Sequence, residues 1–345
     1  MVDTKKITAQ AEMHHALLLG LQLMVSTNRS PEIVGDWMFR LFRRQHLEKF
    51  VSSFDKLGLT GLPDAVACAQ YHVMSNSIGG VPVEYMYESD RKAWVRFRYP
   101  RWMYHGPTIC GVPQSVSQGF LSGWYAYNGV SLNNPRLGFV CVSEDMTGEF
   151  GLCGYFLEYD HELSDEERLR FAKGEMPPAY EPNQQPELPS AEWDANRLQK
   201  AHRNYAMDYI RNGIGELAKV IGESDTLELA GRAAKLIGLQ YASQTREMLE
   251  VDDGDLLSAA HYLQSMFEGL GDTVETHQDA DHIILEQRGL RIVRGITGAE
   301  RELLLKIWVQ LWQGALASFR RMKNLHVEIQ REAIIWRMSE IESGS

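Results

Sequence analysis

A proline-rich segment divides this chain. Residues 174–190, GEMPPAYEPNQQPELPS, hold five of the twelve prolines of the 345-residue sequence and almost no aliphatic side chains. Because proline fixes φ and removes a hydrogen-bond donor, we expect an extended connector here rather than part of a core. The sequence therefore predicts two domains, residues 1–173 and residues 191–345, and the length of the chain agrees with that number.

The two halves carry similar patterns. At a shift of 191 positions, residues 64–90 align with residues 255–281 without a gap. The identical pairs are Asp64 and Asp255, Ala69 and Ala260, Tyr71 and Tyr262, Gly80 and Gly271, Val83 and Val274, Glu84 and Glu275, and Asp90 and Asp281. We therefore predict an α+β fold of two related halves, each with helices packed on a small antiparallel sheet, that arose by internal duplication.

Apolar spacing sets the limits of the expected elements. The second half has a long apolar stripe from Leu304 to Phe319, so we expect a degenerate repeat that serves packing or dimerisation. The first half is expected to have helices at 10–27, 31–57, 63–76 and 113–128 and strands at 81–87, 92–99, 137–143 and 152–159. The second half is expected to have helices at 203–221, 225–247 and 255–267, a hairpin at 272–288 and a helix from Thr297.

Composition excludes several classes of partner. With 35 basic and 46 acidic residues the formal net charge is -11, which argues against binding to nucleic acid or to an anionic membrane. The start of the chain lacks the pattern of a signal peptide, and no run of apolar residues is long enough to span a membrane. The four cysteines form no CxxC pair, which favours reduced thiols. We predict a cytoplasmic protein.

The common cofactor and metal motifs are missing from the sequence. It contains no HExxH, GxGxxG, GxxxxGK[ST] or GxSxG pattern, so we expect neither a cofactor nor a metal. The stretch from His277 to His282, HQDADH, could hold a metal, but charged side chains are also typical of a hairpin turn, and we favour the turn.

Residues 94–106, WVRFRYPRWMYHG, concentrate arginines and aromatic rings. Strand alternation places Arg96 and Arg98 on one face, where they either pair with acidic residues or bind an anionic ligand. Pro100 ends the strand, so the residues after it are expected in a loop. These loop residues are the predicted substrate-binding Arg101 and Trp102 and the predicted catalytic Tyr104 and His105, with His105 as the leading general acid or base.

Further candidates lie on the predicted helices. His72 is the second acid or base candidate, and its counterpart in the second half is Leu263. The helix after Pro113 carries Trp124, Tyr125 and Tyr127, which we predict to contact a substrate ring. Gly119 and Gly123 precede them and permit close approach by a backbone or a ligand. Cys153 could be a nucleophile, but a buried, inert thiol is the simpler interpretation.

Three short motifs stand out between residues 60 and 160: Ile78-Gly79-Gly80 before the hairpin, the run from Arg96 to Pro100, and Cys153 followed by Gly154-Tyr155-Phe156. With these motifs, residues of roughly 60–160 resemble the family named after L-2-amino-thiazoline-4-carboxylic acid hydrolase. The order of elements is also similar to that of vinyl-reductase-type small-molecule sensor domains. The resemblance implies small α+β domains and, by the family name, hydrolysis of a small ring.

Three functions agree with these features. The first is a cofactor-independent acid/base enzyme, a lyase or hydrolase, that acts on a small aromatic and anionic or phenolic molecule. The second is a small-molecule-binding or sensory module without turnover. The third is a structural protein whose aromatic patch docks the second half or another subunit of a homodimer.

Overall fold

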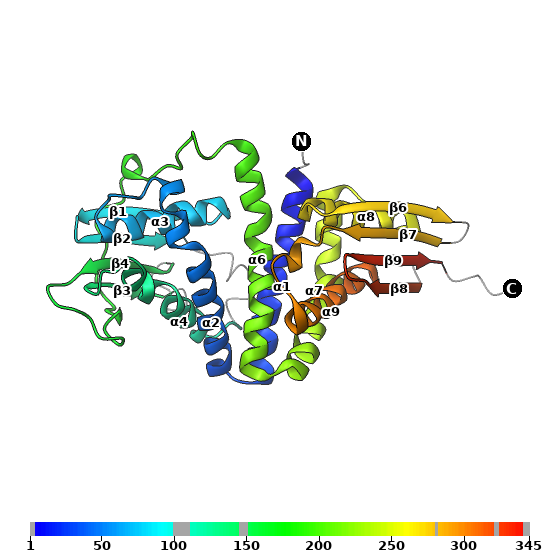
Figure 1. Ribbon diagram of the computed structural model, residues 1–345, viewed down its shortest axis with the longest axis horizontal. Coiled ribbons are helices and arrows are strands. Elements are labelled where there is room, and N and C mark those ends of the chain that lie inside the picture. The colour runs from blue at the N-terminus through cyan, green and yellow to red at the C-terminus, as the bar shows by residue number, and fades with distance from the viewer. Residues whose placement is uncertain (1–3, 99–110, 145–150, 280–281, 321–323, 341–345) are drawn as a thin grey trace. The chain divides into compact units, whose positions relative to one another are not determined.

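The computed structural model describes residues 4–98, 111–144, 151–279, 282–320 and 324–340 (Figure 1). Within these residues the chain forms a five-stranded sheet and a four-stranded sheet, and helices pack against both. The predicted α+β class is confirmed. No helix in the described ranges is long and apolar enough to cross a membrane.

The chain forms two compact units, residues 25–201 and residues 1–24 with 202–345, called here the 25–201 unit and the C-terminal unit. Helix α1 (Thr4–Asn28) therefore contributes its first 21 described residues to the C-terminal unit. There the buried His14 accepts a hydrogen bond from Trp308 Nε1 at 3.1 Å. This grouping differs from the predicted division, which placed residues 1–24 with the rest of the first half.

The 25–201 unit contains the five-stranded sheet, in the order β1-β2-β4-β3-β5. Neighbouring strands are antiparallel except β3 and β5, which are parallel. Both faces are covered, because Trp94 and Tyr155 on the face away from α3 are buried as well. The elements are α2 (Pro31–Lys49), α3 (Asp64–Ile78), β1 (Val83–Ser89), β2 (Lys92–Phe97), α4 (Ser115–Gly123), α5 (Asn128–Ser131), β3 (Leu137–Ser143), β4 (Cys153–Glu158) and β5 (Leu169–Phe171), with short 3-10 turns η1 (Val51–Ser53), η2 (Asp55–Leu57), η5 (Tyr125–Tyr127) and η6 (Pro182–Gln184).

The predicted connector lies within the 25–201 unit. The side chain of Gln185 accepts a hydrogen bond from Tyr85 N and donates one to Tyr85 O, both at 2.8 Å. Further along, Trp193 Nε1 donates to Lys56 O at 2.8 Å. The later part of the connector and the residues just after it are therefore fixed to the rest of the 25–201 unit.

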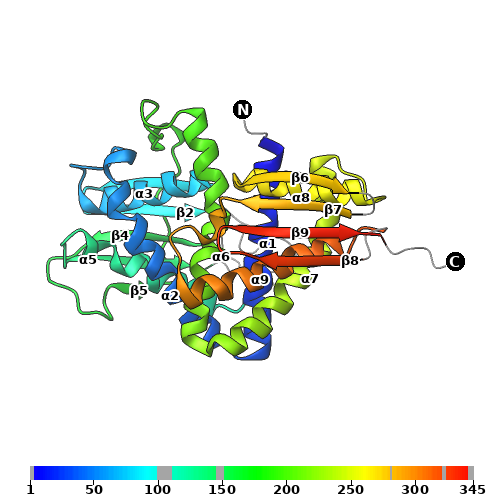
Figure 2. The same cartoon turned by 45° about the vertical axis from the view of Figure 1, so that its right-hand side comes forward.

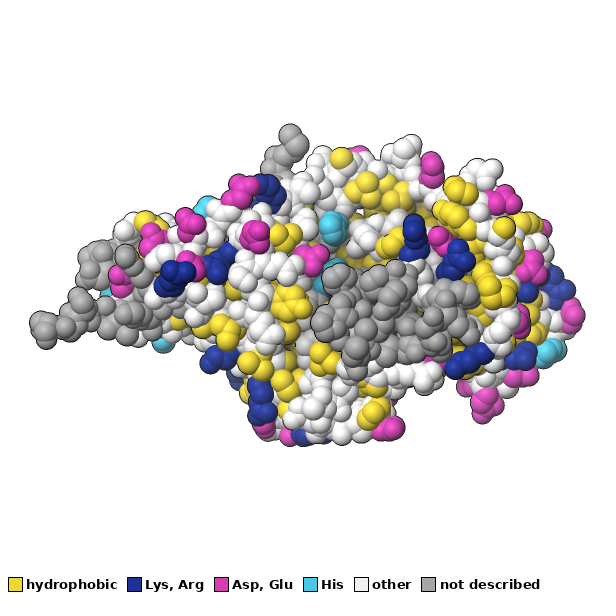
Figure 3. Space-filling model, turned by 180° about the vertical axis from the view of Figure 1, so that it is seen from behind, with side chains coloured by type: hydrophobic (Ala, Val, Ile, Leu, Met, Phe, Trp, Pro, Cys, Tyr) yellow, Lys and Arg dark blue, Asp and Glu magenta, His cyan; other side chains and the backbone are white. Residues whose placement is uncertain are grey.

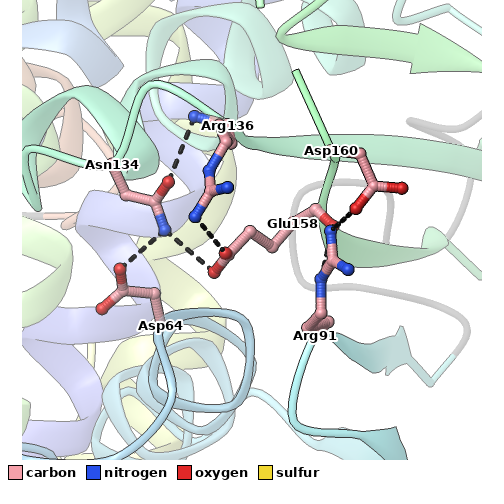
Figure 4. Close-up of polar contacts among 6 residues, drawn as sticks. All are labelled: Asp64, Arg91, Asn134, Arg136, Glu158 and Asp160. Carbon is pink, nitrogen blue, oxygen red and sulfur yellow. Dashed lines mark hydrogen bonds and ion pairs between the residues drawn. The ribbon is translucent and has the colours of Figure 1, made fainter. Parts of the chain in front are cut away.

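A polar network ties three segments of the 25–201 unit together (Figure 4). Asn134 Nδ2 donates to Asp64 Oδ2 at 2.8 Å and to Glu158 Oε2 at 3.1 Å. Arg136 Nη2 adds a bond to Glu158 Oε1 at 3.1 Å, and Arg91 bonds the Glu158 carbonyl and Asp160. One amide thus links the start of α3 to the end of β4, which fits a structural role.

The C-terminal unit contains the four-stranded antiparallel sheet, in the order β6-β7-β9-β8 (Figure 2). Its strands are packed by α8 and α9 around the buried rings of Phe267, Trp308 and Trp336. The second hairpin was not predicted. The elements are α6 (Ala195–Ile221, in this unit from His202 on), α7 (Glu223–Leu249), α8 (Leu256–Leu270), β6 (Thr273–Asp279), β7 (His282–Arg288), η7 (Arg291–Val293), α9 (Gly298–Leu316), β8 (Asn324–Ile329) and β9 (Ala333–Ser339).

The two sheets share a topology. In each, a first hairpin is followed by a helix and a second hairpin, and the second strand of the first hairpin pairs with the last strand of the second. The aligned residues 64–90 and 255–281 lie on α3–β1 and α8–β6. This agreement fits two related halves, while their origin by duplication stays a prediction.

Close helix pairs recur in both units. A Cβ on Gly119 or Gly123 of α4 would collide with the backbone of α2, so the approaching group is a helix backbone and not a ligand. In the C-terminal unit, a Cβ on Gly238 of α7 would collide with Leu311 O, and one on Gly314 of α9 with Lys235 O. Glycine therefore sets the spacing of both helix pairs.

Candidate functional site

Four predicted site residues lie outside the described residues. These are Arg101, Trp102, Tyr104 and His105. The loop predicted after Pro100, and the role of His105 as general acid or base, therefore stay predictions.

His72 lies in the core of the 25–201 unit. Its ring is 2% exposed and stacks on Tyr125 at 3.9 Å and on Phe156 at 5.5 Å between centroids. Asn128 Nδ2 donates to its Nε2 at 3.0 Å. Burial, and then the neighbouring His46, lower the pKa of His72 well below its ordinary value, so the ring is neutral. This environment is that of a packed core ring.

Trp124 and Tyr125 belong to the same core, where they are 9% and 1% exposed. Tyr127 is less buried, and its ring lies 3.9 Å from the Arg43 guanidinium and 5.9 Å from that of Arg168. The three predicted ring-binding residues are therefore divided between a packed core and an arginine-flanked position.

Arg96 and Arg98 share one carboxylate. Arg96 Nε donates to Glu84 Oε2 at 2.6 Å, as the ion-pair alternative predicted. Arg98 Nε lies 3.8 Å from Glu84 Oε1, and its side chain is 68% exposed. The register pairs Arg96 with Cys153, whose pKa burial raises to about 12, so that thiol is protonated near neutral pH.

The C-terminal unit holds a cavity of about 600 Å³ at one end of its sheet, called here the arginine cavity. Its lining comes from the segment after α8, the segment after β7, the first turn of α9 and the β8–β9 turn. The charged lining residues are Arg291, Arg294, Arg301, Arg331 and Glu332. Positive charge therefore exceeds negative charge in a space large enough for a small ligand.

Local hydrogen bonds position two of these arginines. Arg291 Nε donates to Gly271 O at 3.2 Å, and Arg301 Nη2 donates to Arg331 O at 2.6 Å. Gly271 ends α8 with φ +83°, a conformation that glycine adopts without strain. The left-handed cap thus turns the chain so that the start of β6 lies beside η7.

Two guanidinium groups lie close to Gly271. A Cβ on this glycine would lie 2.5 Å from Arg203 Nη1 and 2.7 Å from Arg291 Nε, so the two guanidiniums converge there. Arg203 is 7% exposed, and its Nε has no hydrogen-bond partner among the described residues. Burial, and then the charge of Arg291, lower the pKa of Arg203.

This cavity was not predicted from the sequence, because we expected the second half to serve packing or dimerisation. The sequence contains one partial indication of this cavity, because Arg288, Arg291 and Arg294 recur at a spacing of three residues. The other arginines come from segments that only the fold brings to the same end of the sheet.

The described residues contain no group of three or more His, Cys, Asp or Glu side chains that could hold a metal ion. No family model matches the chain, and no curated protein matches it. The resemblance to the thiazoline-carboxylate hydrolase family stays a prediction.

Proposed function

We propose that the chain binds a small anionic molecule in the arginine cavity of the C-terminal unit. The observation that carries this proposal is the gathering of four arginines and one glutamate around about 600 Å³. Guanidinium groups bind carboxylate and phosphate through paired hydrogen bonds, which makes them suited to such a ligand. Small-molecule binding without turnover was the second of the three functions that the sequence allowed, although we expected the site in the first half of the chain.

The charge of the whole chain supports a local site rather than a general affinity for anions. A formal net charge of -11 repels anions at a distance, so binding requires a local concentration of arginines. On the face drawn in Figure 3, the Lys and Arg side chains lie among Asp and Glu side chains. Among the described side chains drawn there, the basic ones form no continuous surface.

Replacing Arg294, which lines the cavity, is expected to weaken binding of sulfate and oxalate. Loss of one charged hydrogen-bonding partner is worth roughly 1.5–3 kcal/mol, so Arg294→Gln should lower the affinity by about ten- to a hundredfold. Isothermal titration calorimetry with each anion measures the change.

The matched control is Arg288→Gln. Arg288 ends β7, pairs with Glu286 and does not line the cavity, so the same charge is lost beside the site. We expect a change of less than about threefold, because an exposed charge is screened. If both variants weaken binding equally, or if neither anion binds at millimolar concentration, the proposal is contradicted.

A second proposal concerns the 25–201 unit, as a cofactor-independent lyase or hydrolase of a small aromatic and anionic or phenolic molecule. The observation that favours it is the exposed and loosely paired guanidinium of Arg98, which directly follows β2. It precedes Arg101 to His105 in the sequence, and in this proposal Arg98 orients the substrate for proton transfer by His105.

A cytoplasmic location and a homodimer also stay proposals.

Turnover of a panel of aromatic acids, phenols and cyclic amides tests the enzyme. His105→Gln should lower kcat by about 10²- to 10⁴-fold and leave ligand affinity nearly unchanged, because a general acid or base acts on the barrier. Arg98→Gln should raise KM instead. An unchanged kcat in His105→Gln would exclude the assigned role.

A further inference from the structure

Asp272 is a buried carboxyl directly behind the arginine cavity. It follows Gly271, which lines the cavity, and it is 6% exposed. Its Oδ1 accepts a hydrogen bond from Arg291 N at 3.0 Å, and its Oδ2 accepts one from Gln287 Nε2 at 2.7 Å. Gln287 Oε1 in turn accepts from Trp336 Nε1 at 3.1 Å. The carboxyl is therefore held in one place by a fixed network.

Two positive charges act on this carboxyl. They belong to Arg291 of η7 and Arg203 of α6, whereas Gln287 of β7 and Trp336 of β9 are neutral. His202, next to Arg203 in the sequence, interacts with Glu12 and His15 instead. Among the described residues that face Asp272, its carboxyl is thus the one negative group beside two guanidiniums. Arg291 lines the cavity, and Arg203 is buried behind it.

The carboxyl of Asp272 changes its charge near neutral pH. Burial raises the pKa of this carboxyl to about 7, although both hydrogen bonds and both arginines oppose the rise. The charged and neutral forms are therefore both populated under ordinary conditions.

We propose that Asp272 is the internal counter-ion of the Arg203–Arg291 pair and that an anion enters the arginine cavity together with a proton, which Asp272 takes up from solvent. This inference rests on the proposed anion-binding function. The ionised carboxylate attracts the two guanidiniums and repels an incoming anion. Protonation removes this competitor and leaves both positive charges to the ligand.

The coupling also restricts the class of ligand. A ligand that is itself protonated in the same pH range loses its negative charge. Its affinity therefore does not rise when Asp272 becomes neutral. The site should therefore favour anions that stay ionised below neutral pH, such as carboxylates, sulfates and phosphodiesters. Sulfate is the suitable probe, because its charge is constant over this range.

Calorimetric titration of the full chain with sulfate tests the inference. Between about pH 8 and about pH 7 the affinity should rise by up to tenfold, and it should level off below the pKa of Asp272. Repeating the titration in buffers of different ionisation enthalpy should show uptake of nearly one proton per sulfate at the higher pH. Asp272→Asn should bind sulfate with the same affinity at each pH and take up no proton.

Glu332→Gln is the matched control, because it removes one negative charge from the cavity lining and leaves Asp272 in place. It should raise the affinity by a similar factor at each pH and keep the proton uptake. Sulfate binding without proton uptake by the native chain would overturn the inference and leave the proposed function standing. Absence of both sulfate and oxalate binding would overturn both. The measurement on the native chain holds even if Asp272→Asn does not fold.

Discussion

Acidification from pH 6.5 to about 4 is expected to lower the free energy of unfolding steeply, because the buried His14, His46 and His72 and the half-buried His15 are neutral in the folded chain. Burial lowers the pKa of His14 and His46 to about 4 and that of His15 to about 3. It lowers the pKa of His72 well below the ordinary value. Each unit contains two of these rings.

The sign follows from proton binding. Below pH 6.5 the unfolded chain protonates these histidines and the folded chain does not, so their contribution is complete above pH 6.5 and is lost as pH falls. Each histidine contributes a slope of about 1.4 kcal/mol per pH unit. Asp272, whose pKa is raised, contributes one proton of opposite sign up to pH 7, which leaves a net slope of roughly 4 kcal/mol per pH unit.

Urea unfolding at a series of pH values measures this slope. His72→Phe retains a ring between Tyr125 and Phe156 and should reduce the slope by about 1.4 kcal/mol per pH unit. His277→Gln replaces a histidine that is exposed on β6 and should leave it unchanged. A free energy of unfolding that stays flat across this window would show that the rings are not buried as neutral groups.

Gly238→Ala is expected to destabilise the C-terminal unit by about 3 kcal/mol, or roughly 10 °C in Tm. The added Cβ would collide with Leu311 O, a backbone atom of α9 that moves only if the helix moves. Alanine favours a helix by up to about 1 kcal/mol over glycine, which is too little to offset the collision. Differential scanning calorimetry measures the change.

Gly231→Ala supplies the control from the same helix. Its Cβ would meet the end of the Gln310 side chain, which can rotate away, so we expect stability within about 1 kcal/mol of the native chain. Equal losses in the two variants would mean that helix spacing is not what Gly238 determines.

The sequence predicted the elements with strong periodicity. The stretches 64–90 and 255–281 gave the right elements because apolar spacing and turn residues are local signals. The β8–β9 hairpin was missed, although polar and apolar side chains alternate from Asn324 to Ile329, because we expected the long helix from Thr297 to complete the second half.

The candidate sites were harder to predict because burial and partner choice are not local. His72 was a reasonable acid or base from its type, but the rings that cover it come from η5 and β4. Arg96 and Glu84 meet only through strand register. In the arginine cavity, Arg301 and Arg331 meet Arg291 only after two helices and two hairpins are in place.

The side chain of Gln185 gives the connector a second role. By bonding both polar backbone groups of Tyr85, it acts as a single peptide unit added to the outer edge of β1. An open edge of this kind is a template on which another molecule's strand can add and start aggregation. At Tyr85 the connector therefore occupies the hydrogen-bonding groups of the edge strand that another strand would need.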